Sequence, residues 1–393
     1  MRFFTISVSL PLLIVKNCLM NIALISPYHG GSHKAWAAGY QRHSNHDVRL
    51  WTLPARFWKW RMHGGAVTLA RRFLENGRSP SPHLILATDM LDLTTFLALT
   101  RPHTANVPAV LYMHENQLTY PLPGSGETGP MRRQLGERDY HYVFINFSSM
   151  LAADAVLFNS RYHLESWFAA LPRYLKHFPE FNELNAIDAL RRKCSVLPVG
   201  IDLARFDPPP RPQPAEPPLI LWNQRWEYDK NPDDFFAALA DVAAAGVPFR
   251  LALCGEQFGK RPSAFARAIP QFSQQLIHTG FAGAETYRRL LWEADLVVST
   301  AHHEFFGISI LEAIYCRTLP LLPNRLSYPE LIPPSHHAAC LYESQPDLVE
   351  KLKQALNHPD QLSDQTRKLA TAVSHFAWPH IAPQYDTFLK KLL

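Results

Sequence analysis

Residues 299–313 read STAHHEFFGISILEA, and they join the apolar run DLVVST at 295–300 to a helical pattern. Glu304 lies in the loop between them, and Glu312 follows two turns into the helix. A strand, a polar loop and a helix in this order are typical of a parallel α/β sheet. Because such sheets bind ligands at the carboxyl ends of their strands, we expect both glutamates at a binding cleft.

The same loop carries His302 and His303 directly before Glu304, which would suggest a metal site. Adjacent residues on one strand point to opposite faces, however, and no second cluster of ligands completes a coordination shell. We therefore expect no metal here. The start of the helix can bind an anion instead, because its first amide N–H groups have no partner within the helix. The residues at this start are Phe306, Gly307 and Ile308.

Short apolar, β-rich runs alternate with helical stretches along the whole chain. They lie at 21–26, 48–53, 83–88, 109–114 and 155–160, and then at 219–224, 249–254, 276–281 and 295–300. Seven of the eleven residues 208–218 are proline, which continues neither a helix nor a central strand. The alternation therefore predicts two Rossmann-like α/β domains, at 20–206 and 219–375, that face each other across a cleft. A proline-rich linker at 207–218 joins them.

Composition excludes several classes of protein. The 393 residues are 47% hydrophobic, which is too apolar for a disordered chain, and no apolar run reaches the ~18–20 residues of a membrane span. Five widely spaced cysteines without a CxxC pair exclude a disulfide framework and a cysteine zinc site. They favour a reducing compartment, and we expect a cytoplasmic protein.

Charge is unevenly distributed along the chain. Residues 1–205 carry 22 Lys and Arg against 14 Asp and Glu, whereas residues 206–393 carry 17 against 20. A basic first half favours a polyanionic partner, although ordinary scatter would give the same balance.

The first nineteen residues resemble a signal peptide, because Arg2 precedes an apolar run. No small-residue cleavage site follows that run, and Met20 directly precedes the first strand. We interpret residues 1–19 as a start-site extension, with an uncleaved anchor as the alternative.

Polar residues follow the strands of the first half. Gly30 and Gly31 lie between the first strand and a helix, where glycine lets the backbone approach an anion or a sugar, or makes a plain tight turn. Asp89 follows the third strand and could accept a hydrogen bond from a substrate hydroxyl. The fourth strand ends in four polar residues that are costly to pack and so indicate a site: His114, Glu115, Asn116 and Gln117.

In the second half, Arg225 and Lys230 lie in the loop before a helix that starts near Pro232. Two cations beside a helix N-terminus can clamp a pyrophosphate, although a solvated loop often carries such a pair.

Together these residues resemble the pattern of glycosyltransferase family 4. The matching residues are Glu304-x7-Glu312, Arg225-x4-Lys230 and His114. The resemblance implies the GT-B fold, in which a C-terminal helix, here 376–393, crosses back to the first domain. It also implies retaining transfer of a sugar from a nucleotide donor without a metal.

Longer segments resemble the tRNA-queuosine α-mannosyltransferase branch of that family. They read MHENQLTYP, NQRWEYDKNPDDFF, CGEQF, STAHHEFFGISILEA and YPELIP. This resemblance implies GDP-mannose as the donor and the cyclopentenediol of queuosine in tRNA as the acceptor. Arg317 departs from the pattern, since relatives usually carry glycine there.

The resemblance also implies roles for single residues. Glu304 would hold hydroxyls of the donor sugar and Glu312 the ribose of the nucleotide, while His114 would lie near the sugar and phosphate. Arg225, Lys230 and the amides of the helix start would stabilise the departing pyrophosphate. We assign catalysis to His114, Arg225, Lys230 and Glu304, and donor binding to Gly30, Gly31, Arg225, Lys230, Phe306, Gly307, Ile308 and Glu312.

The acceptor is expected on the basic first domain. We assign acceptor binding to Asp89, Glu115, Asn116, Gln117, Arg132 and Arg133. Residues 56–61 interleave cations with aromatic residues, as on RNA surfaces that also stack bases, unless these aromatic residues pack in the core.

Two other functions are compatible with parts of the pattern. The same chemistry could act on a lipid or polysaccharide acceptor, or the chain could be a catalytically silent RNA-binding module. The silent module leaves unexplained why Arg225, Lys230, Glu304 and Glu312 are all present.

Overall fold

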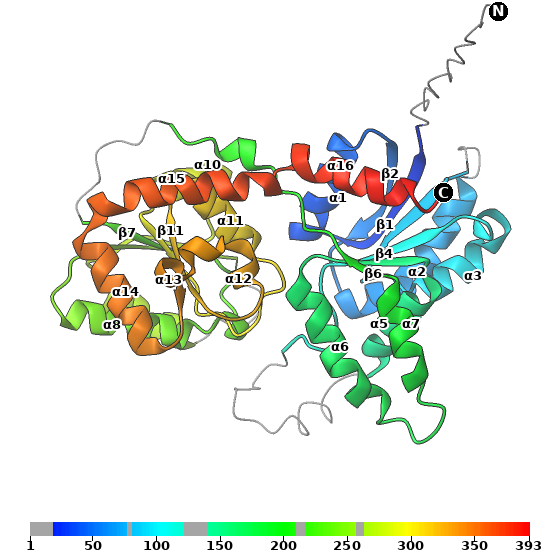
Figure 1. Cartoon of the computed structure of the whole chain (residues 1–393), viewed down its shortest axis with the longest axis horizontal. Helices are drawn as coiled ribbons and strands as arrows, with labels where there is room; N and C mark the ends of the chain where they lie inside the picture. The colour runs from blue at the N-terminus through cyan, green and yellow to red at the C-terminus, as the bar shows by residue number, and fades with distance from the viewer. Residues whose placement is uncertain (1–18, 77–80, 122–139, 210–216, 257–262) are drawn as a thin grey trace, which may run out of the picture.

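The computed structural model describes residues 19–76, 81–121, 140–209, 217–256 and 263–393. They form two α/β domains that lie side by side, and the C-terminal end of the chain returns to the first domain (Figure 1). Each domain contains a six-stranded sheet of parallel strands. Within the described ranges, no helix is long and apolar enough to cross a membrane.

The N-terminal sheet has the strand order β2-β1-β3-β4-β5-β6. Its strands are β1 (Asn21–His29), β2 (Asp47–Pro54), β3 (Leu84–Thr88), β4 (Ala109–Met113), β5 (Ala155–Phe158) and β6 (Cys194–Val196). The side chains of β1 alternate between two apolar layers: Ile22 and Leu24 belong to one buried cluster, and Ala23 and Ile25 to another. Helices on both faces supply the remainder of these layers. They are α1 (Gly31–His43), α2 (Trp58–Glu75), α3 (Leu93–Thr104), α5 (Tyr140–Ala152), α6 (Arg161–Leu175) and α7 (Ile187–Arg192).

The C-terminal sheet has the order β12-β11-β10-β7-β8-β9. Its strands are β7 (Leu219–Trp222), β8 (Arg250–Cys254), β9 (Leu276–Gly280), β10 (Leu296–Val298), β11 (Leu319–Pro323) and β12 (Leu341–Tyr342). Its helices are α8 (Pro232–Ala244), α9 (Ser263–Gln271), α10 (Ala284–Glu293), α11 (Ile308–Tyr315), α12 (Tyr328–Leu331), α13 (His337–Cys340), α14 (Gln345–Asn357) and α15 (Leu362–Val373). The order reverses between β1 and β3 in the first sheet and between β10 and β7 in the second, and in open α/β sheets ligands bind beside such a point, outside the carboxyl ends of the strands.

The structure confirms the predicted GT-B architecture of two parallel α/β domains, but the sequence pattern missed three strands. β6 and β12 have 3 and 2 residues, too few for a recognisable run. β11 reads LPLLP, and its prolines argue against an inner strand although all five residues are buried. Residues 1–18 of the expected start-site extension and 210–216 of the expected linker lie outside the described residues.

The predicted crossover helix is α16 (Trp378–Lys390), which packs on α1 of the first domain (Figure 1). Asp386 accepts hydrogen bonds from the Tyr40 hydroxyl at 2.9 Å, the Ser44 hydroxyl at 2.7 Å and the Asn45 amide at 2.9 Å. At the other end of the helix, the Trp378 indole lies on two glycines. A Cβ at Gly39 would come within 2.0 Å of this ring, and one at Gly200 within 2.4 Å.

Candidate active site

Loops at the carboxyl ends of the strands meet between the two domains. After β4, the Tyr120 hydroxyl accepts a hydrogen bond from Arg225 Nη2 at 3.2 Å, and the Pro121 carbonyl accepts one from the Tyr228 hydroxyl at 2.8 Å. After β5, the Ser160 hydroxyl donates to the carbonyl of Phe305 at 2.6 Å. The loops after β7 and β10 therefore contact those after β4 and β5, and the predicted site residues lie around this junction.

Lys230 is the buried cation of the second domain, with 5% of its surface exposed. Its Nζ lies 2.8 Å from the His303 carbonyl and 3.2 Å from both Glu304 Oε2 and Asp229 Oδ2. Burial alone would lower the pKa of Lys230, but Glu304 and Asp229 outweigh burial and raise the pKa above its usual value. Lys230 is thus a fixed positive charge that donates hydrogen bonds to the His303 carbonyl and to Glu304 and lies beside the Asp229 carboxylate.

Glu304 is held in the loop by bonds to both of its oxygens. Oε2 pairs with Lys230, and Oε1 accepts the Phe306 amide at 3.3 Å. Burial would raise the pKa of Glu304, yet Lys230 overcomes this and lowers the pKa, so the group is a carboxylate. The loop reaches α11 through Gly307, whose φ of 104° favours glycine. The amides of Gly307 and Ile308 therefore lie at the start of α11, beside Glu304, as the sequence predicts.

Glu312 lies on α11 and already has two partners. Its Oε1 lies 3.0 Å from Arg205 Nη2, and its Oε2 accepts the Tyr287 hydroxyl at 2.8 Å. Burial raises the pKa of Glu312, which a nearby Arg205 partly offsets. A ribose that binds here would have to share or replace these partners, so the predicted contact between Glu312 and the nucleotide stays a prediction.

Arg225 faces the first domain and is surrounded by acidic groups. Its Nη1 lies 3.1 Å from Glu227, and its Nη2 lies 3.9 Å from Asp229 and 3.2 Å from the Tyr120 hydroxyl. Although burial acts against the charge, these neighbours raise the pKa of Arg225. With 40% of its side chain exposed, Arg225 can reach an anion between the domains.

The wall formed by the first domain is lined by neutral histidines. Asp89 Oδ1 accepts the His114 amide at 2.9 Å, and the Asn159 side chain donates to the His114 carbonyl at 2.9 Å. The imidazole of His114 lies 4.4 Å from that of His33 and 4.7 Å from Trp36, between ring centroids. Burial and the neighbouring imidazoles hold the pKa of His114 well below its usual range. Its Nε2 is buried and has no hydrogen-bond partner among the described residues.

Two further histidines enclose Phe305 at the junction. The His163 ring stacks on Phe305 at 3.9 Å, and the His303 ring lies 4.3 Å from it on an edge. His163 Nδ1 lies 2.8 Å from Asn159 Oδ1, which can only accept, so this nitrogen carries the proton. Burial lowers the pKa of both imidazoles, to about 3 for His303. In each ring, Nε2 is buried without a partner in the described part of the chain.

The other predicted residues of the first domain lie at the same edge. Asn116 is fully buried, and its Oδ1 accepts the amides of Leu118 and Thr119 at 3.0 and 2.8 Å, so it shapes the turn after β4. Glu115 accepts a hydrogen bond from Gln117 at 3.2 Å, and burial raises the pKa of Glu115.

Asp89 is 1% exposed, and it positions His114. Gly31 has a φ of 50°, and a Cβ at Gly30 would come within 2.4 Å of the Ala55 side chain. Arg132 and Arg133 lie outside the described residues. Contacts of all these residues with substrates stay predictions.

Four residues of the site were not predicted from the sequence: His33, His163, Arg205 and Tyr287. His163 had a usable signal, since it follows shortly after β5, where the same rule selected His114 after β4. Arg205 and Tyr287 had no such signal in the sequence. Their ion pair and hydrogen bond with Glu312 join segments that are far apart in the chain.

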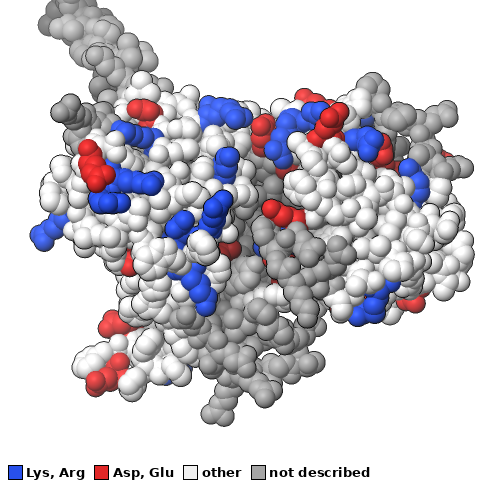
Figure 2. Space-filling view, turned by 180° about the vertical axis from the view of Figure 1, so that it is seen from behind, with Lys and Arg blue, Asp and Glu red and all other residues white. Residues whose placement is uncertain are grey.

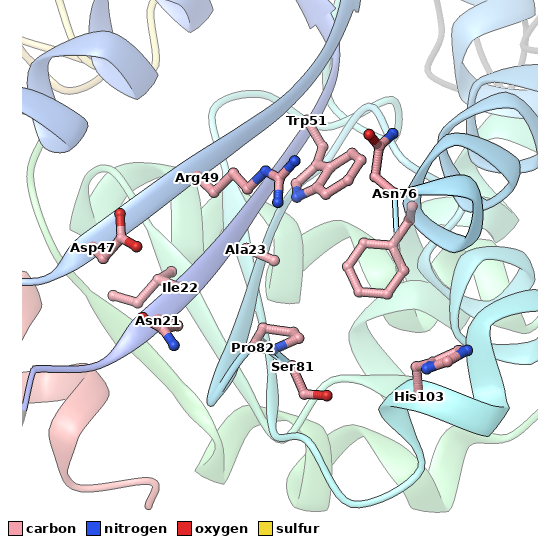
Figure 3. Close-up of a pocket in the computed structure, with 11 residues that line it drawn as sticks. Asn21, Ile22, Ala23, Asp47, Arg49, Trp51, Asn76, Ser81, Pro82 and His103 are labelled. Atoms are coloured by element: carbon pink, nitrogen blue, oxygen red, sulfur yellow. The ribbon is translucent and has the colours of Figure 1, made fainter. Parts of the chain in front are cut away.

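A separate cavity of about 70 Å³ opens at the amino ends of the strands of the N-terminal sheet, at the edge opposite the junction of the domains (Figure 3). It is lined by Asn21 and Asp47 at the first residues of β1 and β2, and by Phe73 and Asn76 near the end of α2. These are the amino ends of the strands, so the cavity is not part of the junction between the domains. Within the described part of the chain, no group of three or more His, Cys, Asp and Glu side chains could hold a metal ion.

Comparisons with known proteins match both halves of the chain. Residues 21–201 match the model described as tRNA-queuosine alpha-mannosyltransferase N-terminal, and residues 205–372 match that of glycosyl transferases group 1. The chain is 32% identical over 343 residues to the tRNA-queuosine alpha-mannosyltransferase of Drosophila melanogaster, covering 84% of this chain and 86% of that protein.

More distant similarities agree with the fold. A GDP-mannose:cellobiosyl-diphosphopolyprenol alpha-mannosyltransferase of Xanthomonas oryzae is 24% identical over 52% of this chain and 53% of its own. Among solved structures, sucrose-phosphate synthase from Thermosynechococcus elongatus superposes with a TM-score of 0.68 at 16% identity, covering 95% of this chain and 99% of the other.

Proposed function

The chain belongs to the tRNA-queuosine α-mannosyltransferase family of glycosyltransferases, and from this premise we propose that it transfers mannose from GDP-mannose to the cyclopentenediol of queuosine in tRNA. The observation that carries the proposal is the cluster of Arg225, Lys230 and Glu304 at the junction of the domains. A tRNA acceptor also favours a cytoplasmic location.

The positive charges of Arg225 and Lys230 in the second domain can stabilise a nucleoside diphosphate as a leaving group. When the bond between mannose C1 and the phosphate oxygen breaks, negative charge grows on the pyrophosphate. Arg225, Lys230 and the amides at the start of α11 are fixed in place to stabilise that charge. Glu304 is ionised and accepts hydrogen bonds, which suits sugar hydroxyls.

We propose that the acceptor hydroxyl attacks C1 on the face that the phosphate leaves. The new bond joins the queuosine oxygen to C1, and the hydroxyl proton passes to the departing phosphate oxygen. This route retains the configuration at C1 and needs no protein nucleophile. The neutral imidazole of His114 can hydrogen-bond the sugar or phosphate without adding charge.

The test is a donor panel with nucleoside mass analysis. Purified protein is incubated with queuosine-containing tRNA and either GDP-mannose, UDP-glucose or UDP-galactose, and the tRNA is digested. Queuosine should gain one hexose with GDP-mannose, while tRNA that lacks queuosine should not change. Transfer with a UDP-sugar alone, or no gain with any donor, would overturn the proposal.

We also propose that protein cations perform the work of a metal ion in this site. Transfer should then continue after treatment with EDTA. Loss of transfer that a divalent ion restores would contradict this part of the proposal.

A further inference from the structure

Three exposed aromatic residues lie where α2 begins, and we call Phe57, Trp58 and Trp60 the aromatic rim. We propose that the aromatic rim stacks unpaired bases of the acceptor RNA next to the reactive nucleoside. The inference rests on the proposed function, since it takes the acceptor to be an RNA. The alternative prediction from the sequence, that Trp58 and Trp60 pack in the core, is wrong for Trp60, which is 62% exposed; Phe57 is 78% exposed and Trp58 37%.

The rim lies at the cleft edge of the first domain. It follows β2, whose neighbour in the sheet is β1, and the carboxyl ends of these two parallel strands lie at the same edge. Ala55, two residues before the rim, lies against the turn after β1, because a Cβ at Gly30 would come within 2.4 Å of the Ala55 Cβ. An RNA whose reactive nucleoside enters the cleft from this side would pass over the rim.

Trp60 is arranged as a flat platform. A Cβ at Gly64 would come within 2.5 Å of Trp60 Cζ2 and 2.6 Å of Cε2, so one side of the indole lies against the backbone of α2. The other side accounts for its exposure. Phe57 has a φ of 52°, a left-handed conformation that is unusual for a bulky residue and recurs at functional sites.

The surroundings of the rim are positively charged. Residues 55–74 contain five cations and no acidic residue: Arg56, Lys59, Arg61, Arg71 and Arg72. Lys59 Nζ lies 5.7 Å from the centroid of the Trp58 ring and 5.6 Å from that of Tyr142 on α5. Figure 2 shows Lys and Arg side chains gathered on one face of the first domain.

This pattern fits single-stranded RNA better than a lipid surface. Aromatic side chains that stack bases, among cations that neutralise phosphates, characterise proteins that bind unpaired nucleotides. A helix that lies in a membrane needs a continuous apolar face. Here Lys59 lies between Trp58 and Trp60, and the apolar face of α2, with Met62, Leu69 and Phe73, is buried inside the domain.

Two variants test the platform in different ways. Trp60→Ala removes the ring, and Gly64→Ala keeps the ring but forces it off the helix. Each should raise the KM for queuosine-containing tRNA about 10-fold, the usual loss for one base–aromatic stack. The affinity for GDP should stay that of the parent, because the donor side lies in the other domain. Phe181→Ala, at an aromatic residue that is 86% exposed on the loop after α6, is the matched control and should leave the KM unchanged.

Thermal midpoints of all three variants within a few degrees of the parent show that the fold is intact. If the KM is unchanged in both Trp60→Ala and Gly64→Ala while the parent still transfers a hexose to queuosine, the inference about the aromatic rim is wrong. The proposed function is then unaffected. A parent that transfers no hexose to any tRNA overturns both. If the parent co-floats with phosphatidylserine vesicles, Trp60→Ala does not, and tRNA kinetics are unchanged, the rim is a membrane surface and the inference is wrong.

Discussion

The two walls of the cleft are built from different chemistry. The wall of the second domain carries full charges that are paired with each other, with Lys230 between Glu304 and Asp229. The wall of the first domain carries neutral imidazoles, such as those of His114 and His163, whose Nε2 atoms have no partner among the described residues. The second domain thus holds its charges in pairs around Lys230, although the Nε2 of its His303 is also without a partner in the described part of the chain, whereas the first domain contributes unpartnered imidazole nitrogens.

This difference indicates how each substrate must bind. Lys230 Nζ already lies near the His303 carbonyl, Glu304 and Asp229, so a donor pyrophosphate must share this cation with them or displace one of them. The imidazole Nε2 of His114 has no partner among the described residues, so a hydroxyl that reaches it would add a hydrogen bond without breaking one. The following predictions separate these two modes.

The largest effect is expected on the charged wall. Lys230→Ala should lower kcat for hexose transfer by about 10²–10³, the usual cost of removing one group that stabilises transition-state charge. Lys368→Ala removes an exposed lysine of α15 and serves as the control. The measurement is steady-state transfer at saturating donor, with the thermal midpoint as a check of folding. Activity within a few-fold of the parent would show that Lys230 is structural.

The neutral histidines of the first domain should make the free energy of unfolding depend on pH. Burial, together with His29, lowers the pKa of His33 to about 4. The folded state resists protonation of His33, whereas the unfolded state takes up the proton below pH 6.5. Stability is therefore lost as the pH falls from 6.5 towards 4, by up to about 1.4 kcal/mol per pH unit for this group.

The measurement compares denaturant midpoints of the parent and His33→Phe at several pH values. The parent should lose stability more steeply than the variant between pH 6.5 and 4.5, and equal slopes would mean that His33 is protonated in the folded protein.

His114→Phe should have a smaller effect on catalysis than Lys230→Ala. Phenylalanine preserves the packing against Trp36 but removes the free nitrogen, and a neutral hydrogen bond contributes about 1 kcal/mol, or roughly 5-fold. Hexose transfer is measured as before, over pH 6–8. A loss as large as that of Lys230→Ala would show that His114 carries charge or transfers a proton, and the contrast between the walls would fail.

The smallest effect is expected where the walls are joined. The Glu330 carboxylate of α12 accepts the first two amides of α6, from Arg161 at 2.8 Å and Tyr162 at 2.5 Å. A charge at a helix N-terminus contributes about 0.3–1 kcal/mol, so Glu330→Gln should change kcat/KM about 2–5-fold. Glu350→Gln on α14 is the control. A null result would show that this contact does not help to hold the domains together during the reaction.

The sequence predicted β1 to β5 and β7 to β10, and it missed β6 and β12, which have 3 and 2 residues, and β11, which contains two prolines. It also located most of the cleft, because the rule about strand ends needs no tertiary information. The pairing of Lys230 with Glu304 and of Glu312 with Arg205 depends on contacts between separate loops, which spacing alone does not encode.

Arg317 shows the reverse case, in which the sequence flagged a position and the structure supplies the reason. Its φ of 66° lies in the left-handed region, which favours glycine and strains a side chain.

The crossover helix has a consequence for synthesis of the protein. The surface of α1 around Tyr40 and Ser44 is completed by Asp386, 342 residues after Ser44. At about 5–20 residues per second, a ribosome needs on the order of half a minute to make that intervening chain. In the part of this interval that follows residue 206, the first domain is present without its last helix, and Trp36 and Tyr40 have no cover from α16. Chaperones that bind exposed aromatic surface would therefore meet this chain early, and a stop codon near the end would leave a first domain that never closes.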